Sequence, residues 1–229
     1  MTIPTNLAVV DTETTGMEPT DEVIEVGIIN WQMQLESRFS TTRPIPYAAS
    51  AVHHLTDDDV AGQPLFRDSA PLLRDDLHRA GIQILVAHNA EFDRRMMGQE
   101  FEDFVWICTY KCALHAWPDV ENHKNETLCY YLKVGARGRE MRGTGQAHSA
   151  LFDANQTFCI LQELLKLYSL EQLIQFTTAV KNIVRLPFGK HRGKTWAEID
   201  SGYLAWMTKQ ADMDEDLKEL ATRELRRRR

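Results

Sequence analysis

Short apolar runs separated by polar or glycine-containing turns dominate the first part of the chain. Runs of strand length cover residues 7–10, 23–31 and 35–42, and the short links between them favour an antiparallel meander. Residues 82–87 are apolar apart from Gln83, as expected of a strand buried on both faces, and Val105–Cys108 predicts a further short strand. The pattern therefore predicts a sheet built from several short strands.

Helical periodicity lies between and after these strands. Residues 57–80 are typical of a helix with a break near residues 62–64, and another helix is predicted over residues 91–100. A long helix is expected over about residues 147–168, followed by one that begins at Ser169, a favourable N-cap. Strands and helices in this order predict an α/β fold.

Two stretches of unusual composition follow. Residues 135–146 contain four glycines and three arginines, which favour a mobile basic loop over regular structure. Residues 181–194 carry five positive charges and no acid, with aromatic residues beside them. We therefore expect a large domain, residues 1–178, and a small basic and aromatic module, residues 179–229, which is called the C-terminal segment below.

Composition narrows the class of protein. The 229 residues are 43% hydrophobic, and no apolar stretch approaches the roughly 20 residues that span a bilayer. The first residues lack the basic and apolar regions of a signal peptide, and the four cysteines suit reduced thiols. A cytoplasmic location without membrane contact is expected, and no protein partner can be deduced.

Charge is unevenly distributed along the chain. The formal net charge is −7, yet residues 169–229 hold twelve basic and nine acidic residues, a net charge of +3. An acidic protein is a poor candidate for coating DNA without specificity, but it is compatible with a nuclease whose acids are neutralised by metal ions. Phosphate contacts are expected in the positive C-terminal part.

Two carboxylates stand together at the end of the first strand. Residues i and i+2 of a strand face the same side, so Asp11 and Glu13 project together where the strand leaves the core. A divalent cation that both can ligate would remove their mutual repulsion. Two later acids can join them, namely Asp93 in the first turn of a helix and Asp153 on the inner face of the long helix.

The residues that follow Asp11 and Glu13 in this argument could instead have purely structural roles. Asp93 can serve only to cap its helix, and Asn89, just after the buried strand, can hold the carboxylate or the turn. His148 lies at or before the start of the long helix and is attached to the basic loop, which suits a general base that moves with the substrate. An exposed capping histidine is the alternative for His148.

Together these residues form a known pattern. Residues 11–16 (DTETTG) and 88–93 (HNAEFD), followed by His148 and Asp153, resemble the motifs of the DEDDh, or DnaQ-like, 3′–5′ exonucleases. Further segments resemble the exonuclease X type of that family, namely residues 52–56, 106–109, 188–194 and 203–206. The resemblance implies a ribonuclease H-like fold, a mixed five-stranded sheet flanked by helices with its first three strands antiparallel.

The resemblance also implies a mechanism. Two Mg²⁺ ions, for which Mn²⁺ substitutes, would be held by Asp11, Glu13, Asp93 and Asp153. Asp11 would contact both ions, Glu13 and Asp153 the ion on the side of the attacking water, and Asp93 mainly the other ion. His148 would take a proton from that water.

Substrate contacts are expected around these acids. The residues expected to contact the nucleotide are Thr12, Thr14, Gly16, Met17, Glu18, His53 and Asn89. Met17 would pack against the terminal base, whereas a core or capping role is the alternative for His53. Phosphate contacts are expected from Arg137, Arg139, Arg142, Lys190, Arg192 and Lys194. A solvated basic loop is the alternative for the three arginines of residues 135–146.

The resulting prediction is a metal-dependent 3′–5′ exodeoxyribonuclease that acts on DNA 3′ ends and releases 5′-mononucleotides. The rival within the same fold is an RNA-trimming exonuclease, because a contact to the 2′-hydroxyl depends on details of the pocket. The rival from another class is a catalytically inactive module that binds nucleic acid.

Overall fold

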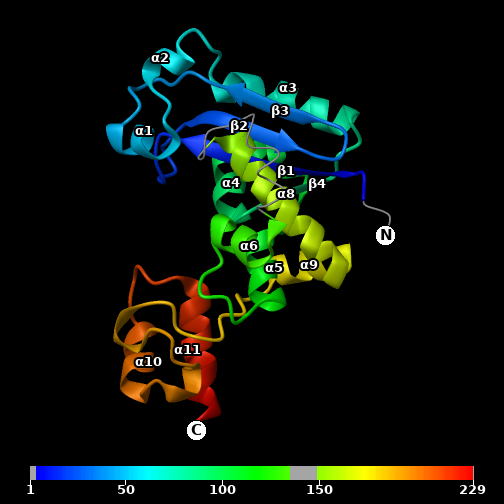
Figure 1. Cartoon of the computed structure of the whole chain (residues 1–229). Helices are drawn as coiled ribbons and strands as arrows, with labels where there is room; N and C mark the ends of the chain where they lie inside the picture. The colour runs from blue at the N-terminus through cyan, green and yellow to red at the C-terminus, as the bar shows by residue number, and fades with distance from the viewer. Residues whose placement is uncertain (1–3, 135–148, 229) are drawn as a thin grey trace.

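A five-stranded sheet forms the centre of the molecule, whose computed structural model describes residues 4–134 and 149–228. The strand order is β3-β2-β1-β4-β5. β1 is antiparallel to β2, and β2 to β3, whereas β4 is parallel to both β1 and β5 (Figure 1). The predicted ribonuclease H-like sheet is therefore confirmed. The strands are β1 (Leu7–Thr14), β2 (Val23–Ile29), β3 (Gln34–Arg38), β4 (Ile84–Ala87) and β5 (Val105–Cys108).

Helices cover both faces of this sheet. Ala8 and Val10 of β1 belong to a hydrophobic cluster with α3 and α4, whereas Leu7 and Val9 belong to a second cluster with α5, α6, α8 and α9. Because alternate residues are buried on opposite faces, the strands read as continuous apolar runs. The helices are α1 (Tyr47–His53), α2 (Asp57–Val60), α3 (Phe66–Arg79), α4 (Ala90–Met97), α5 (Thr109–Ala116), α6 (Asn125–Tyr131), α8 (Ala150–Leu167), α9 (Leu170–Thr178), α10 (Ser201–Met207) and α11 (Glu215–Arg227).

Strand ends differ from the apolar pattern: β1 extends to Thr14, beyond the expected residues 7–10, whereas β2, β3 and β4 are shorter than expected. The strand expected over residues 23–31 ends at Ile29, because the Asn30 side chain accepts the backbone N–H groups of Gln32 and Met33 and closes a turn. The strand expected over residues 82–87 begins at Ile84, after a turn at residues 80–81 that is closed by backbone hydrogen bonds from Gly81 and Ile82.

Helix ends also differ from the predicted bounds. The expected break in residues 57–80 is present and separates α2 from α3. The helix predicted over residues 91–100 ends at Met97, because Gly98 adopts a φ of 81° that a helix cannot continue. The long helix begins at Ala150 and not at residue 147, since the Ser149 hydroxyl accepts the Phe152 N–H as an N-cap.

The C-terminal segment has a hydrophobic core of its own. Leu186, Leu204 and Met207 are buried there, and the partly buried Trp196 packs against them and donates its indole N–H to the Ile183 carbonyl. Trp196 is thus part of this core, although the division of the chain at residue 178 stays a prediction.

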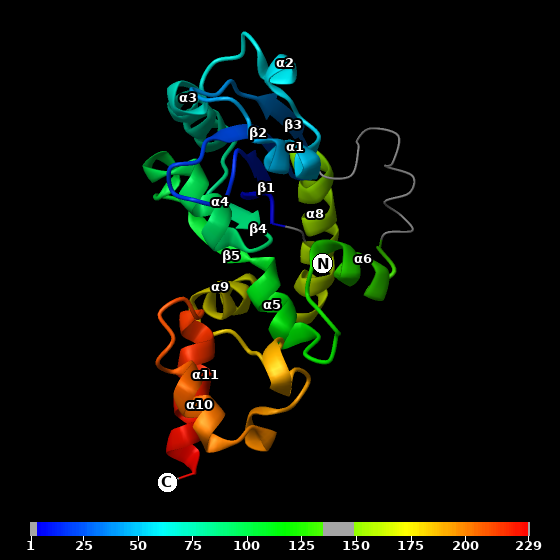
Figure 2. The ribbon, with the colours of Figure 1, turned by 90° about the vertical axis from the view of Figure 1, so that its left-hand side faces the viewer.

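Hydrogen bonds tie the C-terminal segment to the large domain at α5. The Lys111 ammonium donates to the carbonyls of Thr177 and Ala179 at 3.1 and 2.7 Å, and the Asn182 amide donates to the Leu114 carbonyl at 3.1 Å. Figure 2 shows α10 and α11 below α5 and α9, away from the sheet. No helix among the described residues is both long and apolar enough to cross a bilayer.

Candidate active site

Asp11 and Glu13 lie on one side of β1, as the strand pattern predicts. Both are partly buried, whereas Thr12 and Thr14 point to the opposite side and are buried. The ladder to β2 changes register after Glu13, so the strand pairing becomes irregular where the two carboxylates emerge. The local geometry therefore presents two acids at the point where the sheet opens toward solvent.

Asp153 completes a cluster with these two acids. It lies in the first turn of α8, which the Ser149 cap starts, and one carboxylate oxygen from each of Asp11, Glu13 and Asp153 lies within 4.8 Å of the others. Carboxylate oxygens at this spacing are hard ligands that suit a divalent cation. The cluster joins residues far apart in the sequence, and we call it the acid cluster.

Asp93 stands beside the acid cluster but has a different partner. Its carboxylate, only 3% exposed, accepts the hydroxyl proton of Thr12 at 2.9 Å. Thr12 was expected to contact substrate, yet its side chain is buried and positions Asp93 in the first turn of α4. The neighbouring charge of Asp93 still raises the pKa of Asp11.

Burial and mutual repulsion disfavour the ionised form of these acids. Burial, followed by the charges of Asp93 and Asp153, holds the pKa of Asp11 well above its usual range. Burial and the charge of Asp153 raise the pKa of Glu13 to about 8, and burial raises the pKa of Asp93 to about 7. A bound divalent cation would offset this repulsion, so the donor set and its electrostatics both fit a metal ion.

A fifth buried acid, Glu25, was missed by the sequence analysis. It is 0% exposed on β2 opposite Glu13, and it accepts hydrogen bonds from the Ala150 N–H and from the Arg38 guanidinium, both at 2.9 Å. Ala150 is the first residue of α8, so Glu25 supplies a negative charge at that helix N-terminus. An acid within an otherwise apolar strand pattern is the signal that reveals it.

Close packing at Gly27 holds α8 in the same place. A Cβ atom on this residue of β2 would lie 2.3 Å from the Leu151 nitrogen and from the Ala150 carbonyl carbon. Only glycine lets the strand approach the helix start so closely. Glu25 and Gly27 together therefore fix the turn of α8 that carries Asp153.

The loop after β1 presents an exposed side chain near the acid cluster. The Thr14 hydroxyl donates to the Gly16 carbonyl at 2.6 Å, and a Cβ atom on Gly16 would lie 2.4 Å from the Asp21 carboxylate. Met17 is 70% exposed while its carbonyl accepts a hydrogen bond from Arg95. Glu18 is exposed too, and its backbone N–H donates to Asp21. Met17 is thus a fixed apolar projection.

His53 and Asn89 have mainly structural surroundings. His53 is 5% exposed, its Nδ1 accepts the Leu55 N–H at 3.0 Å, and its Nε2 is buried without a hydrogen-bond partner in the described chain. Burial lowers the pKa of His53, which favours a neutral ring. Asn89 has a left-handed φ of 67° and precedes α4, but its side chain makes no capping hydrogen bond.

Some predicted site residues lie outside the described residues: His148, Arg137, Arg139 and Arg142. Lys190, Arg192 and Lys194 are described and are exposed on the C-terminal segment. The Lys190 ammonium lies 5.1 Å from the centre of the Tyr203 ring, within range of a cation–π contact.

Comparisons with known proteins agree with this geometry. The model of the RNase_T exonuclease family matches residues 8–161. The chain is similar to Exodeoxyribonuclease 10 of Escherichia coli K12, with 30% identity over 217 residues that cover 90% of this chain and 92% of the relative.

Solved structures have a similar fold. Exonuclease X in complex with 5′-overhanging duplex DNA is similar at 28% identity and a TM-score of 0.60, over 75% of this chain and 99% of that chain. The nuclease domain of 3′hExo, a DEDDh family member bound to rAMP, has the same fold at 14% identity and a TM-score of 0.56, over 70% of this chain and 91% of that chain.

Proposed function

The chain belongs to the exonuclease family, of DEDDh type, and we propose that it hydrolyses DNA from the 3′ end and releases 5′-mononucleotides. The observation that carries this proposal is the acid cluster, in which carboxylate oxygens of Asp11, Glu13 and Asp153 lie within 4.8 Å of one another. Asp93 lies beside them, so all four acids of the family pattern are present.

Two Mg²⁺ ions, or Mn²⁺ in their place, are the cofactors we propose. Asp11, Glu13 and Asp153 would hold one ion, and Asp11 with Asp93 would hold the other. Bound divalent ions would lower the pKa of a water and stabilise charge on the attacked phosphate and on the leaving oxygen. The raised pKa values of Glu13 and Asp93 support this proposal, because such acids bind protons readily when no cation balances them.

His148 is the proposed general base. It would accept a proton from the attacking water, whose oxygen forms a bond to phosphorus while the bond from phosphorus to the 3′ oxygen breaks. The shortened strand then ends in a 3′-hydroxyl, and the phosphate leaves on the 5′ oxygen of the released nucleotide. His148 precedes the Ser149 cap directly in sequence, within five residues of Asp153.

Met17 is the residue we propose to contact the terminal base. Its exposed side chain stands on a loop whose backbone is held by Arg95 and Asp21, four residues after Glu13 in the sequence. A flexible thioether packs against any base, which suits removal of nucleotides without sequence preference. His53 is too enclosed for a direct ionic contact, and we assign it a role in shaping the same wall.

DNA is the proposed substrate, and RNA is the rival. The similarity to Exodeoxyribonuclease 10 extends over 90% of the chain, which favours DNA. A catalytically inactive binding module is disfavoured, because such a module has no need of a cluster of acids whose pKa values are raised by burial and by one another. The cytoplasmic location stays a prediction.

One gel experiment tests this proposal. Single-stranded DNA and RNA of the same sequence, labelled at the 5′ end, are incubated with the protein and Mg²⁺. We expect a ladder of DNA products that shortens one nucleotide at a time, with slower loss of RNA. Immediate release of the labelled 5′ nucleotide would contradict the direction, and faster digestion of RNA would favour the rival substrate.

A further inference from the structure

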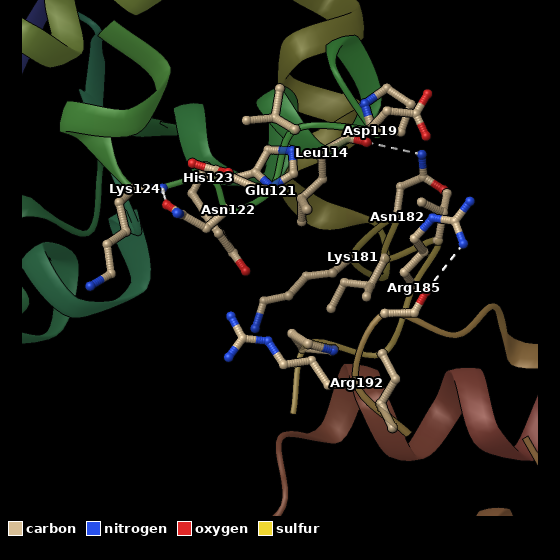
Figure 3. Close-up of a pocket in the computed structure, with 18 of the residues that line it drawn as sticks. Leu114, Asp119, Glu121, Asn122, His123, Lys124, Lys181, Asn182, Arg185 and Arg192 are labelled. Carbon is tan, nitrogen blue, oxygen red and sulfur yellow. Dashed lines mark hydrogen bonds between the residues drawn. The ribbon is translucent and has the colours of Figure 1, made fainter. Parts of the chain in front are cut away.

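A pocket of about 660 Å³ lies between the large domain and the C-terminal segment. Its walls are the end of β4, the loop between α5 and α6, and residues 181–193 (Figure 3). We propose that this pocket binds the sugar-phosphate backbone of the polynucleotide whose 3′ end occupies the acid cluster. The inference rests on the proposed function, since it concerns the same substrate strand.

Unpaired cations in the pocket indicate an anionic occupant. Lys124 and Arg192 are exposed, and neither side chain has an acidic or carbonyl partner among residues 4–134 and 149–228. Figure 3 shows them on opposite sides of the pocket, Lys124 on the large domain and Arg192 on the C-terminal segment. Two free cations on opposite walls of a pocket suit a phosphate chain.

The other charges of the pocket are largely balanced. Lys181 forms ion pairs with Asp214 and Asp216, and the Arg185 guanidinium donates to the Gly193 carbonyl. Two exposed acids, Asp119 and Glu121, also line the pocket and reduce its net charge. Lys124, Arg185 and Arg192 are the lining cations without an ion pair among the described residues, against these two acids.

The histidines of the pocket do not form a second metal site. The His88 ring bonds to the Thr109 hydroxyl at 2.9 Å and to the His123 carbonyl at 2.7 Å, and His123 Nε2 bonds to the Trp117 carbonyl at 3.0 Å. Burial lowers the pKa of His88 to about 4, so the ring is neutral. These hydrogen bonds join the walls of the large domain into one rigid surface.

The pocket begins close to the acid cluster. Asn89 lines it and directly precedes α4, whereas Asp93 lies in the first turn of that helix. Four residues of an α-helix advance by about 6 Å, so the pocket starts roughly one helical turn from Asp93. A strand that ends at the acids can therefore continue into the pocket within one or two nucleotides.

Apolar side chains offer contacts for sugars and bases. Tyr110 and Leu114 of α5 line one wall, and Pro187 lines the other. Single strands bind in grooves that combine cations with aromatic faces, because every base has a face that stacks. The pocket has both elements, with Tyr110 and Lys124 from the large domain and Arg192 from the C-terminal segment.

Charge reversal in the pocket tests this inference. We would compare wild type with Lys124→Glu/Arg192→Glu and with Lys209→Glu, a control on an exposed cation of the C-terminal segment outside the pocket. The substrates are a 12-nucleotide single-stranded DNA and the p-nitrophenyl ester of thymidine 5′-monophosphate, which spans only one nucleotide. Thymidine 5′-monophosphate serves as a competitor.

The pocket variant should raise KM for the 12-mer about tenfold with little change in kcat, and the slope of log Kd against log salt should fall by about 1.4 for two lost contacts. Hydrolysis of the p-nitrophenyl ester should equal that of wild type. An unchanged KM for the 12-mer would overturn the inference. Equal weakening of thymidine 5′-monophosphate would also overturn it, because the pocket would then hold the released nucleotide.

Two further results keep the inference separate from the proposed function. Should wild type release no nucleotide from either substrate, the proposed function fails, while binding of a fluorescent 12-mer still tests the pocket. Should the double variant lose ester hydrolysis, the milder variant Lys124→Gln/Arg192→Gln is tested in its place. Its KM for the 12-mer should increase in the same way, and an unchanged KM would contradict the inference.

Discussion

The acid cluster and the C-terminal segment hold opposite charges in different surroundings. Asp11 and Glu13 are partly or fully enclosed at the end of the sheet, where burial and like charge raise their pKa values. Lys194 and Arg192 are exposed, and neither forms an ion pair within the part of the chain that the structure describes. Enclosed charges of one sign cost stability and require a counterion, whereas exposed charges cost little and remain free to meet a ligand.

Removing one acid of the cluster should have the largest effect. Asp153→Asn keeps the shape of the side chain but removes a ligand charge, so kcat should fall about 10²–10³-fold with the fold retained. The matched control is Asp58→Asn, an exposed acid of α2 that should leave kcat unchanged. Steady-state release of nucleotides measures both, and near wild-type turnover by Asp153→Asn would reject the assignment.

Glu25 offers a test of an enclosed charge that is already paired. Glu25→Ala removes the acceptor of the Ala150 N–H and the partner of Arg38, so the free energy of unfolding should fall by about 2–4 kcal/mol. Glu36→Ala, an exposed acid on β3, should change it by less than about 0.5 kcal/mol. Urea unfolding measures both variants. If the two substitutions lowered the free energy of unfolding equally, Glu25 would not position α8.

The pH dependence of stability should differ with and without metal. Folding raises the pKa of Glu13 from 4.5 to about 8 and the pKa of Asp93 from 3.8 to about 7. Between the unfolded and the folded pKa of each acid, the folded state therefore binds more protons than the unfolded state. Stability of the metal-free protein should therefore fall as pH rises from about 4.5 to 8.

Thermal unfolding in EDTA and in Mg²⁺ measures this difference. Mg²⁺ should raise the melting temperature more at pH 8 than at pH 6, because at pH 6 protons occupy the acids of the folded protein and compete with the cation, whereas at pH 8 more of these acids are ionised. Glu13→Gln should weaken this pH dependence. A Mg²⁺ effect that is the same at both pH values would contradict the electrostatic account of the acid cluster.

The smallest effect on stability is expected when an exposed cation of the C-terminal segment is replaced. Lys194→Glu reverses an exposed charge of the C-terminal segment, so the free energy of unfolding should change by less than about 0.5 kcal/mol. Affinity for single-stranded DNA at low salt should nevertheless decrease, and the decrease should vanish at high salt. If Lys194→Glu lowered the free energy of unfolding more than Glu25→Ala does, the claim that enclosed charges matter more for stability than exposed ones would be contradicted.

The sheet and its acids followed from simple patterns in the sequence. The period of two placed Asp11 and Glu13 on one side of β1, and the structure confirms that placement. Asp93 and Asp153 required the resemblance to a family, since no local rule connects α4 and α8 with β1. Glu25 was missed because one acid in an apolar run gives no sign of the helix that it will meet.

Three of the helices missed by the sequence analysis share a physical cause. α1, α5 and α6 are seven or eight residues long and start after Pro46, Cys108 and Lys124, none of which provides a side-chain capping bond. Without a polar cap and with few turns, they carry little periodic signal. The pocket was equally hidden, because it exists only where three distant segments meet.

The most direct measurement of the central claim is nucleotide release during a Mg²⁺ titration. Single-stranded DNA and wild-type protein are mixed in excess EDTA, and Mg²⁺ is then added in steps while free 5′-mononucleotide is quantified. The account predicts no release in EDTA and full recovery as Mg²⁺ exceeds the chelator, because the acid cluster acts through bound cations. Undiminished release in excess EDTA would contradict it.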